Sequence, residues 1–324
     1  MHNYNLSQRL LHKIALAPKL MREASFDIER GLFHNNLEAA DGNHVFVSGL
    51  ARSGTTLLLN TLFNTEDFAS LTYDDMPFLL APNLWSKLTG FKQHEFSVER
   101  AHGDGMLVGT DSVEAFEEVF WNTFPDNEID SHEKFKDYVR LILGKYKKLR
   151  YLSKNNQNIK RIRLINKIFP KSPILVPFRD PLQQSYSLLG QHKRFVEFGT
   201  RDKFITSYMA LIGHTEFGDS YKPIADSQLK YENYMTLNHW LEQWLTVYKN
   251  ILNVFDNIDM VKLVCYETFC EDSEVLNKIG NIVDKKLPKL AEFKQSVRDI
   301  DDEYDDKLLE ACNHIYSELK VRSI

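Results

Sequence analysis

Residues His44–Leu59 read HVFVSGLARSGTTLLL and carry the strongest structural signal in this chain. A short apolar segment at 44–49 leads into a glycine-bounded loop, and a helix start follows. Gly49 and Gly54 have the spacing of a loop that wraps its backbone around a phosphate group. Such a loop turns backbone N–H groups and the positive end of the next helix toward an anion. The sequence therefore predicts an anion-binding turn after a first strand.

The loop departs at one position from the pattern of nucleoside triphosphatases. Those proteins have a lysine after the second glycine, and this lysine reaches the β- and γ-phosphates. Here Thr55 holds that position, and a cation stands earlier, at Arg52. A phosphate group still suits the loop, whose candidate ligands are Arg52, Ser53, Gly54, Thr55 and Thr56. An ordinary strand–turn–helix, with Ser53 or Thr55 capping the helix, is the alternative.

The composition of the 324-residue chain is that of a globular protein, 43% hydrophobic and 26% charged. A formal net charge of −5 gives no reason to expect nucleic acid as a partner. The three cysteines lack metal-ligand spacing and fit a reducing compartment. No apolar run reaches the roughly 18 residues of a membrane helix, and the N-terminus lacks signal-peptide features. We therefore expect a cytoplasmic protein without a membrane span.

Short apolar segments that alternate with long helical ones predict an α/β fold. Besides 44–49, the apolar runs 174–178 and 261–265 predict buried strands. Strands separated by long helices give a P-loop-like parallel sheet with helices on both faces. No linker or repeat divides the chain, so we predict one domain over 1–324, with 1–43 as a helical extension packed on it. A loop is expected at 64–71, and helices at 54–63, 73–88, 112–121, 131–151, 157–168, 203–217, 231–254 and from 273 onward.

A second anion-binding turn is predicted after the strand 174–178. Arg179 leaves this strand, and Asp180, which a proline follows, is a strong helix start. Pro177 has no N–H to donate and should fall at the strand's end. Ser187, near the second turn of the helix, is placed to share one phosphate group with Arg179. Ligands of parallel sheets bind at the carboxyl ends of the strands, so two such turns indicate a nucleoside with phosphates at both ends.

These segments resemble those of sulfotransferases that use 3′-phosphoadenosine 5′-phosphosulfate (PAPS), and the resemblance spans about 44–270. GLARSGTTLL resembles the 5′-phosphosulfate loop of that family. VPFRDPLQQSYSLL resembles its 3′-phosphate segment, where arginine and serine have the spacing of Arg179 and Ser187. VCYETF resembles a turn whose tyrosine, here Tyr266, lies near the adenine. A bacterial-type P-loop sulfotransferase is implied, which uses PAPS without a metal ion and transfers the sulfuryl group to a hydroxyl in preference to an amine.

The resemblance also implies catalytic residues. Lys154 stands where the family has a lysine that contacts the moving sulfuryl group, and a mobile point charge suits the charge that grows as the S–O bond breaks. A solvated lysine in a polar turn is the alternative. For the general base the family has His or Glu in the segment after the loop, where this chain has Asp74 and Asp75. We favour Asp75, because apolar residues follow it and would desolvate it, over His102 in the glycine-rich AHGDG.

Other features of the sequence suggest no chemistry. Glu114, Glu117 and Glu118 are expected to form a solvated helix face, and Trp240 and Trp244 to belong to the core. Two other functions compete: a P-loop kinase of small molecules, which would need magnesium-bound ATP, and a non-catalytic nucleotide-binding protein of the same fold. The acceptor, which can be a carbohydrate, lipid, peptide or small molecule, and the oligomeric state are not fixed by these residues.

Overall fold

The computed structural model describes residues 6–34, 42–90, 98–99, 107–108, 116–201, 203–225, 229–288 and 297–324. At its centre lies a five-stranded parallel sheet with the order β2-β5-β1-β6-β7. Its strands are β1 (Val45–Val47), β2 (Phe68–Ala69), β5 (Arg150–Lys154), β6 (Ile174–Phe178) and β7 (Val261–Cys265). A separate antiparallel pair joins β3 (Val98–Glu99) to β4 (Leu107–Val108). The predicted α/β fold with a parallel sheet is confirmed.

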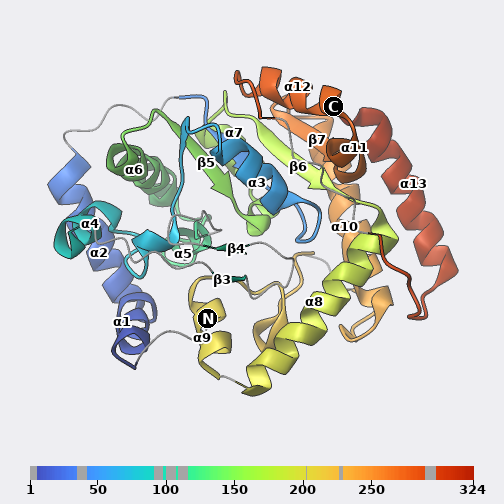
Figure 1. Ribbon diagram of the computed structural model, residues 1–324, viewed down its shortest axis with the longest axis horizontal. Helices are drawn as coiled ribbons and strands as arrows, with labels where there is room; N and C mark the ends of the chain where they lie inside the picture. Colours follow the sequence, from blue (N-terminus) through green and yellow to red (C-terminus); the bar gives the residue numbers. More distant parts are fainter. Residues whose placement is uncertain are drawn as a thin grey trace.

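Helices surround the sheet. They are α1 (Leu6–Leu16), α2 (Lys19–Phe33), α3 (Thr55–Phe63), α4 (Pro82–Thr89), α5 (Glu118–Trp121), α6 (Ile129–Tyr146), α7 (Ile162–Ile168), α8 (Pro181–Arg201), α9 (Lys203–Leu211), α10 (Leu237–Phe255), α11 (Tyr266–Glu271), α12 (Ser273–Ile282) and α13 (Asp306–Arg322). Short 3₁₀ helices are η2 (Tyr73–Asp75), η3 (Asn156–Lys160) and η4 (Gly218–Ser220). In Figure 1, α1, α2, α4 and α6 gather at one end of the molecule, and α13 lies at the other. Among the described residues, none of the helices is long and apolar enough to span a membrane.

Both faces of the sheet are buried, and each has its own core. Val45 and Val47 of β1 point to one core, where they pack with residues of α3 and α12. Phe46, between them, points to the other and larger core, to which α6, α8 and α10 contribute. A sheet covered on both faces favours strands that are apolar at nearly every position. This is why the apolar runs at 174–178 and 261–265 predict β6 and β7 with the observed bounds.

Two strands lie where the sequence predicts other structure. The predicted helix 131–151 ends as α6 at Tyr146, and β5 then begins at Arg150. Lys147 ends the helix in the left-handed conformation, with φ 52°. Glycine usually takes that position, so the sequence contains no visible stop signal. The other missed strand, β2, lies within the predicted loop 64–71.

The helix start after β6 is confirmed. The side chain of Asp180 accepts a hydrogen bond of 2.8 Å from the backbone N–H of Gln183, as an N-cap residue does. Pro177 is the last residue but one of β6. Pairing between β1 and β6 ends at Leu175, so the absent N–H of Pro177 interrupts no bond to β1.

A buried carboxylate ties α2 to α4. Glu29 has no exposed surface, and its oxygens accept hydrogen bonds from the backbone N–H groups of Asn83 (2.8 Å) and Leu84 (2.9 Å). The side-chain amide of Asn83 donates a further bond of 2.7 Å. Backbone N–H groups in the first turn of a helix have no partner within it, so Glu29 satisfies two such groups of α4. Burial raises the pKa of Glu29 above its usual value.

We expect Glu29→Gln to lower the free energy of unfolding by about 1–3 kcal/mol, because the amide offers one acceptor oxygen and turns its NH₂ group toward a donor. Chemical denaturation measures this change. Glu23→Gln, half-buried on the same helix and paired with the exposed Lys19 over 3.5 Å, is the matched control and should stay near the wild-type stability, because an ion pair at the surface contributes little. Equal stability of the two variants would contradict a capping role for Glu29.

Candidate active site

The loop between β1 and α3 has the shape that an anion-binding turn requires. Arg52 and Gly54 both adopt positive φ, 67° and 93°. Gly54 is the N-cap residue of α3, and as a glycine it makes no side-chain cap hydrogen bond. Ser53 is buried and donates its hydroxyl to the carbonyl oxygen of Leu50 over 2.7 Å. Capping by Ser53 or Thr55 therefore does not explain the loop, and the first N–H groups of α3 lie at a helix end suited to an anion.

The two predicted anion-binding turns are in direct contact. Nε of Arg52, in the loop after β1, donates a 3.0 Å hydrogen bond to Oγ of Ser187 on α8. Ser187 is buried, and Arg52 is half-buried. A ligand with two anionic groups can therefore reach both turns at the same edge of the sheet.

Tyr266, the first residue of α11, joins this edge from β7. The guanidinium carbon of Arg179 lies 4.9 Å from the centre of the Tyr266 ring, which is a cation–π contact. On the loop side, a Cβ atom at Gly54 would lie 2.6 Å from Cδ2 of Tyr266. Glycine alone allows both this approach and the positive φ. The aromatic ring thus connects the loop with the end of β6.

Buried residues of α8 and α10 hydrogen-bond to the loop and to one another. The amide of Gln184 on α8 donates to the carbonyl oxygen of Ala51 over 3.0 Å, and its oxygen accepts a 3.0 Å bond from Nε1 of Trp244 on α10. A carbonyl oxygen bonded to Gln184 is not directed at an anion in the loop. Trp240 and Trp244 are buried, as the sequence predicts. The role of Gln184 has no sequence signal beyond its place near the start of α8.

Lys154 is the last residue of β5 and lies beside Val47, the last residue of β1. Its exposed fraction is 8%. Because neighbouring parallel strands end at the same edge, Lys154 and the loop that follows β1 lie at one edge of the sheet. A solvated turn is the alternative that the sequence leaves open for Lys154. In the structure, Lys154 lies instead at the end of a buried strand.

Two adjacent carboxylates hold the residues on either side of Lys154. Glu117 accepts a hydrogen bond from the hydroxyl of Ser153, and Glu118 accepts one of 2.8 Å from Nδ2 of Asn155. Both glutamates are buried, so their expected place on a solvated helix face is wrong. Buried carboxylates need several hydrogen-bond donors. Glu117 accepts further hydrogen bonds from Trp121 of α5, Tyr151 of β5 and Asn158 of η3, and Glu118 accepts one from Arg161, just before α7.

Asp75, the predicted base, is fully buried within a small network. Its carboxylate accepts hydrogen bonds from the backbone N–H of Thr72 (2.8 Å) and the hydroxyl of Tyr146 (2.6 Å), and it forms an ion pair with Lys145. Thr72 caps η2, and Asp75 completes its capping box. Burial raises the pKa of Tyr146, which keeps its hydroxyl a donor. His102, the alternative base, lies outside the described residues, as does Glu114.

One more cation lies against α8. The backbone of Arg298 makes two hydrogen bonds with the side chain of Gln183. Its backbone N–H donates to Oε1 (2.9 Å), and its backbone carbonyl oxygen accepts from Nε2 (3.0 Å). Nη1 of Arg298 would lie 3.8 Å from a Cβ atom at Gly190, less than one helical turn beyond Ser187. Nothing in the sequence around Arg298 predicts this position.

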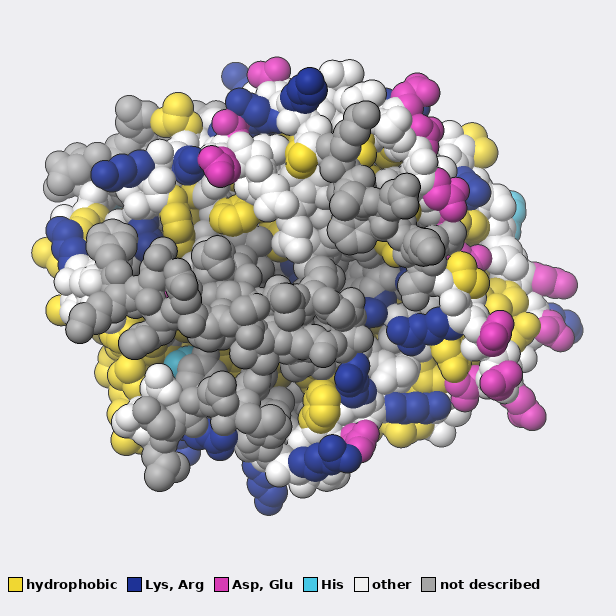
Figure 2. All heavy atoms as spheres, viewed as in Figure 1, with side chains coloured by type: hydrophobic (Ala, Val, Ile, Leu, Met, Phe, Trp, Pro, Cys, Tyr) yellow, Lys and Arg dark blue, Asp and Glu magenta, His cyan; other side chains and the backbone are white. Residues whose placement is uncertain are grey.

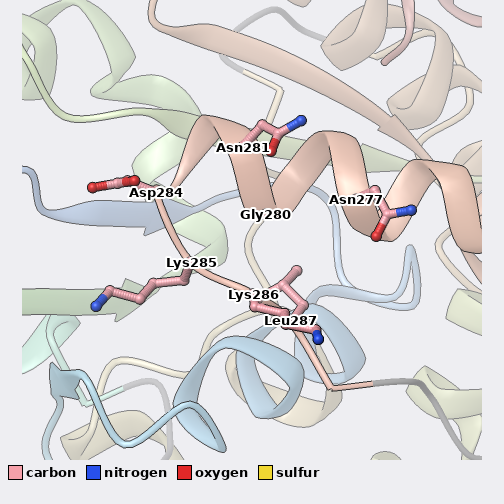
Figure 3. A pocket seen from close by; sticks show the side chains of 7 residues that line it. All are labelled: Asn277, Gly280, Asn281, Asp284, Lys285, Lys286 and Leu287. Atoms are coloured by element: carbon pink, nitrogen blue, oxygen red, sulfur yellow. The ribbon is translucent and has the colours of Figure 1, made fainter.

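Charged side chains are unevenly distributed on one face of the molecule. On the face in Figure 2, Lys and Arg side chains lie over α8, and Asp and Glu side chains gather toward α13. Elsewhere, a polar groove lies beside the end of α12, and its side chains point in different directions (Figure 3). None of the predicted site residues lines that groove. Within the residues that the structure describes, no group of His, Cys, Asp or Glu has the arrangement of a metal site.

Comparison with known proteins agrees with this geometry. A family model described as the sulfotransferase family matches residues 44–275, which include the loop, Lys154, Arg179, Ser187 and Tyr266. This chain belongs to the sulfotransferase family. No curated protein sequence matches this sulfotransferase.

Two solved structures resemble the fold of this sulfotransferase. Sulfotransferase STF9 from Mycobacterium avium is 13% identical, with a TM-score of 0.50 over 98% of this chain and 79% of that chain. Sulfotransferase STF1 from Mycobacterium tuberculosis H37Rv is 11% identical, with a TM-score of 0.50 over 98% of this chain and 86% of that chain. At such low identity these likenesses concern the fold alone.

We expect Gly54→Ala to destabilise the sulfotransferase by about 1–3 kcal/mol, because a Cβ atom there is strained at positive φ and meets the ring of Tyr266. Thermal or chemical denaturation measures the change. Gly190→Ala, on α8, is the matched control: its Cβ atom would lie 3.8 Å from Nη1 of Arg298, an ordinary van der Waals distance, and alanine favours a helix. If Gly54→Ala matched the stability of the control, the ring would not pack on the loop as described.

Proposed function

We propose that this sulfotransferase transfers a sulfuryl group from PAPS to a hydroxyl group of its acceptor by direct in-line displacement. The observation that carries the proposal is the contact between the two anion-binding turns, made by Arg52 with Ser187 and by Tyr266 with Gly54 and Arg179. PAPS has a phosphosulfate at one end of an adenosine and a phosphate at the other. Two anion-binding turns with an aromatic ring between them suit such a donor.

Each segment then has its own task. Arg179 and Ser187 bind the 3′-phosphate, and Tyr266 packs near the adenine. Ser53 contributes its backbone N–H, since its hydroxyl already donates to Leu50. The residues that hold the 5′-phosphosulfate are Arg52, Ser53, Gly54, Thr55 and Thr56. The three cysteines, all within the described residues, form no disulfide, which supports a reducing, cytoplasmic setting.

Charge stabilisation supplies the catalysis in this proposal. PAPS provides a sulfuryl group whose bond to phosphate breaks as the acceptor oxygen attacks the sulfur. Negative charge grows on the bridging oxygen, and Arg52 and Lys154 stabilise it. Buried Glu117 and Glu118 keep the end of β5 in place while the long side chain of Lys154 follows the moving group. The cations and backbone dipoles of the chain perform this task without a metal ion.

The acceptor hydroxyl must also lose a proton, and Asp75 and His102 are the candidates that the sequence offers. Asp75 sits in a desolvated position, as proposed for the base. To accept a proton from the substrate, it has to give up its ion pair with Lys145 or its hydrogen bond from Tyr146. Asp75 would therefore act only after this network opens.

Calorimetry separates a sulfotransferase from a P-loop kinase. We expect adenosine 3′,5′-bisphosphate to bind without magnesium, and ATP with magnesium to bind weakly, because Thr55 replaces the lysine of the triphosphate loop. Radiolabelled PAPS incubated with cell extract and the protein should then give labelled products. Tight bisphosphate binding without any labelled product would instead indicate a non-catalytic binding protein, and preference for ATP with magnesium would indicate a kinase.

Arg179→Ala tests the 3′-phosphate site. We expect this variant to lose about 10- to 100-fold of the preference for adenosine 3′,5′-bisphosphate over adenosine 5′-phosphate, because a charged hydrogen bond is worth roughly 1.5–3 kcal/mol. Calorimetric titration with both nucleotides measures the ratio. Arg163→Ala, exposed on α7, is the control and should keep it. An unchanged ratio in Arg179→Ala would remove Arg179 from the 3′-phosphate site.

A further inference from the structure

The turn between α9 and η4 brings a carboxylate to the sheet edge that carries Lys154. We propose that Glu216, in this turn, takes the proton from the acceptor hydroxyl. The inference rests on the sulfuryl transfer proposed above and names a proton acceptor that the sequence does not indicate.

The first observation is the contact of Glu216 with the segment after β5. Oε1 of Glu216 lies 3.5 Å from Nδ2 of Asn156, the first residue of η3 and the second after Lys154. Asn156 is 6% exposed, and its Oδ1 has no hydrogen-bond partner among the described residues. A buried polar group usually has a partner. The amide of Asn156 and the carboxylate of Glu216 thus form a polar corner next to the end of β5.

The second observation places Glu216 next to the donor loop. A small cavity lies between the loop and the segment 216–224, and Glu216 lines it together with Leu50 and Ala51. Leu50 and Ala51 immediately precede Arg52. Glu216 therefore lies between the beginning of the loop and the end of β5, the two places that hold the cations of the proposed reaction. The remaining cavity wall is largely apolar and aromatic and is formed by Leu188, Tyr221, Lys222, Ile224, Trp240 and Gln243.

The turn that carries Glu216 is fixed at both ends. Before it, Gly213 has φ 81°, and a Cβ atom there would lie 2.5 Å from Cγ of Glu118. After it, Phe217 stacks on Phe195, with ring centres 6.0 Å apart. The backbone of Thr215 accepts a 2.8 Å hydrogen bond from Lys222. The position of Glu216 is thus set by the same Glu118 that holds Asn155 beside Lys154.

Glu216 also differs from the other carboxylates of this region. Glu117, Glu118 and Asp75 are buried, and each accepts several strong hydrogen bonds. Glu216 is half-buried, and its described contact is the single long one with Asn156. A proton acceptor must be reachable by the substrate and must have a lone pair to offer. Glu216 meets both requirements without a change in the described structure.

In the proposed step, the acceptor oxygen replaces the phosphate oxygen of the donor as the partner of sulfur. The acceptor oxygen forms a bond to sulfur, and its proton passes to a carboxylate oxygen of Glu216. The S–O bond of the donor breaks, and its electron pair stays on the phosphate of adenosine 3′,5′-bisphosphate.

The test uses the full chain, radiolabelled PAPS and 2-naphthol, an apolar hydroxyl compound. We expect Glu216→Gln to lower kcat for sulfation of 2-naphthol by about 10²-fold or more, the usual contribution of general-base catalysis. Its affinity for adenosine 3′,5′-bisphosphate should stay that of the wild type, and Glu216→Asp should restore part of kcat. Glu310→Gln, exposed on α13, is the matched control.

Several results would overturn the inference. Wild-type kcat in Glu216→Gln would exclude the proton transfer, and an equal loss of bisphosphate affinity would indicate a structural role instead. If the wild type labels components of a cell extract but not 2-naphthol, the same variants are compared on the labelled fraction, where an unchanged rate in Glu216→Gln would again exclude the proton transfer. If the wild type labels nothing at all, the proposed function itself fails.

Discussion

The packing of Tyr266 between Gly54 and Arg179 is the contact on which the site depends. These three residues follow three neighbouring strands, in the order β1, β6, β7. Because each strand is buried on both faces, a slip of one residue in register would turn its apolar side chains toward the wrong core. The hydrophobic cores thus fix the strand ends, and the strand ends fix the distance between the two turns that we propose to bind anions.

A second constraint comes from charge buried beside the sheet. Burying a carboxylate is unfavourable unless donors surround it, and Glu117 and Glu118 find theirs on both sides of Lys154. Ser153 and Asn155 are bonded to adjacent glutamates, so the backbone of Lys154 has little freedom. A fixed backbone with a long, flexible cation at its end suits the role proposed for Lys154, which is to follow the moving sulfuryl group. The loss of either glutamate would release this segment and leave several donors without a partner.

The sequence predicts the parts of the site whose signals are local. The glycine spacing around Arg52, the helix start at Asp180 and the apolar run of β7 each lie within a few residues, and each is found where it is predicted. The parts that it misses depend on distant partners. β5 ends in the polar residues Ser153 and Lys154, so its sequence does not have the pattern of a buried strand. The donors that bury Glu117 come mainly from β5 and η3, which no pattern around Glu117 reveals.

An acidic residue near the loop is not enough to identify the base, because its hydrogen-bond partners can lie far away in the sequence. Asp75 has the apolar neighbours that the sequence suggests, but Lys145 and Tyr146, far away in the chain, bond its carboxylate as an anion. Protonation of Asp75 would break an ion pair inside the protein, where few other groups can replace it. Protonation of Glu216 would disturb one contact, with Asn156. Because the base gains and loses a proton in every turnover, the carboxylate with the fewest bonds to lose suits that task.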